Sequence, residues 1–143
     1  MSNAKVVFFT GLHEKIVEIV TDHAPEGFET QVIYRNTPLD EQKAAVADAD
    51  FILVYGARLH DDVLKAAPKA RMVQLLAAGY DSMNLKLLRE MEIRCCNNGG
   101  ANSSAGADEA SCLILSLYKQ VIAAHASTTS GEWNAPIDGI NTF

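Results

Sequence analysis

The sequence predicts an α/β protein: a flavodoxin-like, doubly wound sheet of five parallel strands, followed by one long C-terminal crossover helix. Between residues 5 and 100, short apolar runs alternate with segments in which apolar residues recur every three or four positions. That alternation is typical of βαβ units and of a parallel sheet with helices on both faces. The apolar runs are nearly continuous, as in parallel strands that are buried on both sides.

Each predicted element has its own apolar spacing and its own terminating residues. The strands cover 5–9, 30–34, 51–54, 71–76 and 93–96, and the helices between them cover 12–20, 39–49, 60–67 and 85–91. Gly11 and Gly56 end the first and third strands, and Asn97 opens the turn after the fifth. Pro38 suits the first turn of the second helix, and Pro68 closes the third helix.

The segment from Ser103 or Ser104 to about Ser127 is predicted to form a single helix. It holds no proline and no glycine beyond Gly106, and about 24 residues make a helix roughly 36 Å long. One apolar stripe consists of Ala107, Ala110, Ile114, Leu117, Val121 and Ala124, and a second of Leu115, Tyr118 and Ile122. Two stripes need two burial partners. We therefore expect this helix to pack against a further domain or a second copy of the chain, which predicts a homodimer.

Composition and charge exclude several classes of function. Hydrophobic residues make up 48% of the 143 residues and the formal net charge is −6, so no basic surface for nucleic acid or an anionic membrane is expected. Cys95, Cys96 and Cys112 form no CxxC pair, so neither a disulfide scaffold nor a zinc site is predicted, and a reducing cytoplasm is the expected location. No apolar run approaches the ~18–20 residues of a membrane span. Residues 1–4 are typical of a remnant left by an expression tag.

Ligands of open α/β sheets bind at the carboxyl ends of the strands. Four loops of this sequence are expected there, namely 10–11, 55–58, 77–81 and 97–104. In the third loop, Gly79 lets the backbone approach a ligand, and successive N–H groups can form a nest for a carboxylate or phosphate. An ordinary turn between a strand and a helix is the other interpretation, and it stays open.

Four side chains near these loops are further candidates for substrate binding. The Arg58 guanidinium can clamp a carboxylate, unless it is simply a solvated charge on a loop. Tyr55 and Tyr80 each offer a hydroxyl group or pack as partly buried aromatic residues. Asn102 can donate its amide hydrogens just before a helix whose free N–H groups favour anions, unless the segment is simply a long Asn/Gly turn.

No catalytic residue and no metal ligand is predicted. The four histidines are scattered over different elements, without a carboxylate, serine or cysteine partner at a telling spacing. Neither a GxGxxG nor a GxxxxGK[ST] motif is present, so the residues themselves indicate no dinucleotide site and no P-loop.

Three stretches, in the right order and at the right distances, resemble the N-terminal part of the D-isomer-specific 2-hydroxyacid dehydrogenases. They are 72–81 (MVQLLAAGYD), 97–110 (NNGGANSSAGADEA) and 131–133 (GEW). The resemblance implies a flavodoxin-like substrate domain over 5–100 and a long interdomain helix over 101–128. It also implies that 129–143 is a linker towards an NAD-binding Rossmann domain that this chain lacks.

By this resemblance, Ala78, Gly79 and Tyr80 form the turn whose backbone amides hold the substrate carboxylate. Asn102 matches an asparagine that contacts the substrate in some members. Ser104 matches a position near the nicotinamide of the cofactor, which is NAD or NADP. The implied ligand is a small 2-hydroxy or 2-oxo carboxylate.

The loop that holds Tyr55 and Arg58 matches another substrate-facing loop of the family. Here the chain departs from the common Arg-Ser/Asn pattern and the loop is shorter, so the role of Arg58 is less firmly implied. Asp108 and Glu109 stand where many members have Glu-His, which puts the local helix contacts in doubt and not the fold.

The implied parent protein is an NAD(P)-dependent oxidoreductase that interconverts a D-2-hydroxy acid and a 2-oxo acid. The family's catalytic arginine, its acidic partner, its acid–base histidine and its pyrophosphate-binding glycines all lie C-terminal to this stretch. The chain by itself is therefore expected to be inactive and to bind no cofactor. The alternative function is a stand-alone module that binds a small carboxylate or dimerises, without hydride transfer.

Overall fold

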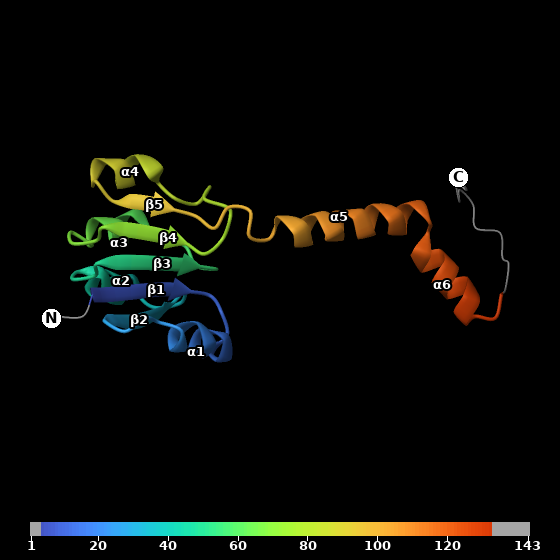
Figure 1. Ribbon diagram of the computed structural model, residues 1–143, viewed down its shortest axis with the longest axis horizontal. Coiled ribbons are helices and arrows are strands. Elements are labelled where there is room, and N and C mark those ends of the chain that lie inside the picture. Colours follow the sequence, from blue (N-terminus) through green and yellow to red (C-terminus); the bar gives the residue numbers. More distant parts are fainter. Residues whose placement is uncertain (1–3, 133–143) are drawn as a thin grey trace. The chain divides into compact units, whose positions relative to one another are not determined.

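The computed structural model describes residues 4–132 and divides the chain into a first unit that ends at Gly99 and a second that begins at Gly100 (Figure 1). The first unit contains the strands β1 (Ala4–Thr10), β2 (Phe28–Tyr34), β3 (Phe51–Tyr55), β4 (Met72–Leu75) and β5 (Arg94–Cys96). They form one parallel sheet in the order β2-β1-β3-β4-β5. This is the flavodoxin-like, doubly wound order, so the predicted fold class is confirmed. The first strand includes Ala4, which the sequence analysis set aside with 1–3.

Four helices connect these strands. They are α1 (Glu14–Asp22), α2 (Leu39–Val46), α3 (Asp61–Lys65) and α4 (Leu85–Glu90). Because parallel strands are joined by right-handed crossovers, this strand order places α1 on one face of the sheet and α2, α3 and α4 on the other. Figure 1 shows α2 and α3 behind the sheet. Each helix that was predicted for this unit is present, with ends that differ from the predicted ones by up to three residues.

The main hydrophobic core lies between the sheet and the face that carries α2, α3 and α4. Alternate residues of the strands meet buried residues of these helices, and the largest contributors are Val7, Phe9, Ile52, Val54, Val73, Leu75, Val46, Val63, Leu64 and Leu88. Burial of each such side chain is worth about 1.5–3 kcal/mol relative to exposure. This packing holds the strand ends, and therefore the loops that follow them, in fixed positions.

The opposite face of the sheet is covered less completely. Of the helices in the first unit, only α1 lies on it, and its Val20 borders a hollow of about 440 Å³. Val6, Phe8, Leu53 and Met72 of the sheet line the same hollow. This face is therefore apolar and partly open.

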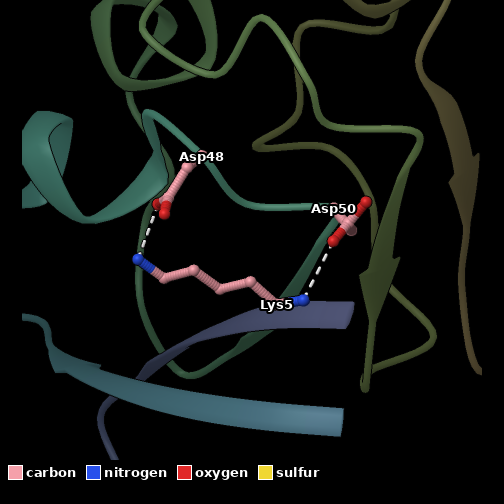
Figure 2. A network of polar contacts seen from close by, with 3 residues as sticks. All are labelled: Lys5, Asp48 and Asp50. Atoms are coloured by element: carbon pink, nitrogen blue, oxygen red, sulfur yellow. Dashed lines mark hydrogen bonds and ion pairs between the residues drawn. The ribbon is translucent and has the colours of Figure 1, made fainter. Parts of the chain in front are cut away.

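Charged residues fasten the amino ends of three strands (Figure 2). The backbone N–H of Lys5 donates to the Asp50 carboxylate at 2.9 Å, and Lys5 Nζ lies 2.6 Å from Asp48 Oδ1. The hydrogen bond from Lys5 holds the pKa of the Asp48 carboxyl below its usual value. Arg71 Nη2 lies 3.4 Å from Asp50 Oδ1. These contacts join the starts of β1, β3 and β4, at the edge of the sheet where ligands of this fold class do not bind.

The second unit corrects the predicted single helix, because its helical segment is broken in two. The two pieces are α5 (Ser103–Tyr118) and α6 (Val121–Thr129). Gln120 has φ 49° and ψ 45°, a left-handed conformation that ends a right-handed helix. The N–H of Lys119 donates to Leu115 O at 2.8 Å, and that of Gln120 to Leu117 O at 3.2 Å, as is usual at a helix C-terminus.

The expected linker 129–143 lies largely beyond the described residues. The structure ends α6 at Thr129 and gives Gly131 a positive φ of 84°. Trp133, Pro136 and Gly139 lie outside the described part of the chain. The placement of a linker therefore stays a prediction.

Candidate functional site

The loops at the carboxyl ends of β1, β2 and β3 are joined by backbone hydrogen bonds. The N–H of Gly11 donates to Tyr55 O at 3.0 Å, which ties the loop after β1 to the end of β3. The N–H of Arg35 donates to Thr10 O at 2.9 Å, which ties the loop after β2 to the end of β1. Thr10 is fully buried, and its Oγ1 accepts a hydrogen bond from the N–H of Leu12 at 3.0 Å. These loops therefore form one continuous, well-held edge.

Two glycines allow this close packing. A Cβ atom on Gly11 would lie 2.3 Å from Gly56 O, a distance that no side chain tolerates. Gly56 itself has φ 65°, in the left-handed region that favours glycine. The two loops therefore touch backbone to backbone, and no side chain separates them.

The turn after β4 holds the three residues expected to bind a carboxylate, and the carbonyl groups of Ala77, Ala78 and Tyr80 accept hydrogen bonds. Ala77 O accepts from the N–H of Asn98 at 3.0 Å, and Ala78 O accepts from Asn97 Nδ2 at 2.7 Å. Tyr80 O accepts from the N–H of Met83 at 2.9 Å. These bonds fix the turn from both sides.

The N–H groups of the same turn are free. Within residues 4–132, the backbone N–H groups of Ala78, Gly79 and Tyr80 donate no hydrogen bond. Gly79 is exposed, and Tyr80 is 52% exposed. Successive free N–H groups beside occupied carbonyls suit an anionic ligand, because such a ligand accepts hydrogen bonds and offers none.

A second feature of this edge is a hollow of about 540 Å³. Its lining is drawn from the loops after β2, β3 and β4, and consists of Arg35, Asn36, Gly56, Ala57, Arg58, His60 and Ser82. The structure thus brings Arg58 together with Arg35, a residue that the sequence analysis did not single out. Its position directly after the second strand was the available signal. Tyr55 and Tyr80 do not line this hollow; Tyr55 is 38% exposed.

The other two predicted site residues belong to the second unit. Asn102 is the residue that precedes α5, and its side chain caps no N–H group of that helix. Ser104 lies in the first turn of α5, and both residues are exposed. The roles of these two residues in binding substrate and cofactor stay predictions.

Cysteine and metal chemistry find little support in the geometry. Partial burial, and then the neighbouring Cys96, raise the pKa of the Cys95 thiol, which disfavours the nucleophilic thiolate. Among residues 4–132, no group of three or more His, Cys, Asp or Glu side chains is placed to hold a metal ion. None of the helices in that same part of the chain has the length and apolar character to span a membrane.

One known protein family matches most of this chain. The family model "D-isomer specific 2-hydroxyacid dehydrogenase, catalytic domain" matches residues 6–133. A glyoxylate reductase from Thermococcus kodakarensis is 30% identical over 132 residues, which are 90% of this chain and 38% of that protein. The chain therefore spans about two fifths of the length of this relative.

Solved structures with the same fold match over most of the chain. A D-lactate dehydrogenase from Treponema pallidum has a TM-score of 0.73 at 18% identity, covering 96% of this chain and 43% of that one. An NADPH-dependent glyoxylate/hydroxypyruvate reductase from Sinorhizobium meliloti, in complex with NADP and malonate, has a TM-score of 0.68 at 21% identity. This match covers 92% of this chain and 40% of the other. At these identities the likeness establishes the fold.

Proposed function

The chain belongs to the D-isomer specific 2-hydroxyacid dehydrogenase family, and from that premise we propose that it is the substrate domain of an NAD(P)-dependent oxidoreductase. The reaction is the interconversion of a D-2-hydroxy acid and a 2-oxo acid. The glyoxylate reductase of Thermococcus kodakarensis and the NADP-bound reductase of Sinorhizobium meliloti support this assignment by what they act on and bind.

The observation that carries the proposal is the turn after β4. Ala78, Gly79 and Tyr80 present N–H groups without a partner among residues 4–132 at the carboxyl edge of the sheet, while the carbonyl groups of Ala77, Ala78 and Tyr80 accept hydrogen bonds. A carboxylate bound there receives charge-assisted hydrogen bonds from the backbone. We assign the carboxylate of the substrate to this turn, with Tyr55 and Arg58 beside it and Asn102 as a further contact.

The first unit is a poor fit for the cofactor. The dinucleotide sites of α/β sheets use a glycine-rich turn after the first strand, and here that turn is Thr10–Gly11, with Gly11 packed against Gly56 O. When bound, NAD or NADP supplies or accepts the hydride. We therefore assign cofactor binding to residues outside this stretch, with Ser104 near the nicotinamide, and propose that the chain alone is inactive.

Substitution of Gly79 tests the carboxylate site. Gly79→Ala leaves the fold intact, because the new Cβ would meet only Asp81 Oδ2 at 3.7 Å, an ordinary contact. We expect the Kd for D-glycerate, measured by amide shifts in 15N-edited NMR spectra, to rise about tenfold as the methyl group crowds the ligand. Gly106→Ala in α5 is the control and leaves the Kd unchanged. A titration in which the amides of 78–80 do not respond to D-glycerate contradicts the assignment.

A second candidate function, dimerisation, is favoured by the apolar surface of the second unit. No residue of α5 or α6 is buried, and Ile114, Leu117 and Ile122 are 65%, 79% and 85% exposed. Exposed apolar surface of this kind marks an interaction site. We expect sedimentation velocity at micromolar concentration to show a homodimer, and the double variant Leu117→Glu/Ile122→Glu to be a monomer. A wild-type chain that sediments as a clean monomer rules this candidate out.

A further inference from the structure

The hollow at the ends of β2, β3 and β4 differs from the carboxylate-binding turn in both its residues and its chemistry. Arg35 and Asn36 follow β2, Arg58 and His60 follow β3, and Ser82 follows β4. None of the residues of the turn 78–80 lines it. Since Ser82 comes only two residues after Tyr80, the hollow adjoins that turn along the chain.

The hollow gathers positive charge on a protein whose net charge is −6. Throughout 4–132, neither the Arg35 nor the Arg58 guanidinium forms an ion pair, whereas Arg71 at the opposite edge lies 3.4 Å from Asp50. No acidic residue lines the hollow. Two guanidinium groups without carboxylate partners are what a doubly charged anion requires, because each can bind it with two parallel hydrogen bonds.

Two acidic residues close to the hollow in sequence, Asp61 and Asp62, have partners of their own. Asp61 and Asp62 line an adjoining cavity that Arg58 also borders. Asp61 Oδ2 accepts a hydrogen bond from Asn84 Nδ2 at 2.7 Å, and Asp62 Oδ1 lies 4.0 Å from Lys65 Nζ. Neither carboxylate is paired with an arginine of the hollow.

The backbone holds the hollow in place before any ligand arrives. The N–H of Arg35 is bound to Thr10 O, and the positive φ of Gly56 directs the chain into the loop that carries Arg58. A Cβ on Gly11 would lie 3.3 Å from Arg35 Cδ, so the aliphatic stem of this arginine runs close beside Gly11. A site that is already formed binds its ligand at a smaller entropic cost.

We propose that this hollow binds a second acidic group of the substrate, a phosphate or a further carboxylate, while the turn 78–80 holds the carboxylate next to the reacting carbon. The inference rests on the proposed function and narrows it to 2-hydroxy or 2-oxo acids with a distal anionic group. Arg35 and Arg58 are the residues that select such substrates.

The proposal is tested on the 143-residue chain with ligands that either carry a second anionic group or lack it. D-glycerate, D-3-phosphoglycerate and D-malate are titrated to about 20 mM, a range that detects millimolar affinity, and the amides of 78–80 and of the Arg35 and Arg58 loops are followed by NMR. We expect the better of the two ligands that carry a second anionic group to bind about tenfold more tightly than D-glycerate, because hydrogen bonds between a guanidinium and an anion are charge-assisted. Arg35→Gln abolishes that preference and leaves D-glycerate binding unchanged, and Arg58→Gln abolishes the preference as well. Arg89→Gln, an exposed arginine of α4 outside the hollow, is the matched control and keeps the preference.

The outcomes separate this inference from the function on which it rests. A preference for D-3-phosphoglycerate identifies the distal group as a phosphate, and a preference for D-malate identifies it as a carboxylate. If D-glycerate shifts the amides of 78–80 but neither D-3-phosphoglycerate nor D-malate binds more tightly, the hollow is not a substrate subsite and the proposed function stands. A preference that survives in the double variant Arg35→Gln/Arg58→Gln also overturns the inference. If no ligand shifts 78–80, the proposed function falls and the inference falls with it.

Discussion

The 143-residue chain is expected to oxidise no NADH or NADPH above the buffer rate when it is supplied with glyoxylate or hydroxypyruvate. Hydride transfer needs the nicotinamide in near contact with the reacting carbon of the substrate, and we assign the dinucleotide to residues beyond this stretch. Enzymes commonly accelerate their reactions by 10⁶-fold or more, so the expected effect of a missing cofactor site is complete loss of turnover rather than a slower rate.

The measurement is the absorbance of the reduced cofactor at matched protein concentrations, with the Thermococcus kodakarensis glyoxylate reductase as the active reference. Cofactor-dependent turnover by the purified chain contradicts this expectation. The Gly79→Ala variant then identifies the source of that turnover. A contaminating enzyme is unaffected by the substitution, whereas turnover at the proposed site falls with it.

The second large effect is on stability, and it comes from Gly11→Ala. The new methyl group would lie 2.3 Å from Gly56 O and 3.3 Å from Arg35 Cδ, so the loop after β1 must move away from the loop after β3. That movement breaks the hydrogen bond from the Gly11 N–H to Tyr55 O. We expect the free energy of unfolding, measured with urea, to fall by about 1–3 kcal/mol, the usual cost of overpacking.

The matched control is the same substitution at a glycine with open surroundings. A Cβ on Gly106 would meet no atom within 4 Å, and alanine is better than glycine by about 1 kcal/mol inside a helix. Gly106→Ala therefore leaves the unfolding midpoint of the first unit where it is. If Gly11→Ala unfolds at the wild-type urea concentration, the close approach of the two loops does not exist in solution.

The fold was predictable because its signals are local and repeated. Apolar runs such as 51–54 and the helical spacing between them follow directly from burial on both faces of a parallel sheet. The break at Gln120 left no such signal. Glycine or asparagine usually marks a left-handed residue, and a glutamine in a segment with no proline and no glycine after Gly106 is expected inside a helix.

The residues of the candidate site also differ in how far they could be predicted from a short stretch of sequence. Gly79 was singled out because a glycine directly after a buried strand is a local signal, and the resemblance to the family extended the predicted turn to Ala78 and Tyr80. Arg35 was missed because its meaning depends on tertiary structure. It follows β2 and Arg58 follows β3, and these strands flank β1, so the two arginines meet only once the strand order is known.

The Lys5–Asp48–Asp50 contacts lie at the amino ends of the strands, whereas every first-unit candidate residue lies at their carboxyl ends. A tag fused ahead of Ala4 therefore emerges at the edge of the sheet remote from the ligand-binding loops (Figure 1). Immobilised through such a tag on a biosensor surface, the protein presents its arginine-lined hollow to the flowing solution. Affinities measured on the sensor can then be compared directly with those from NMR.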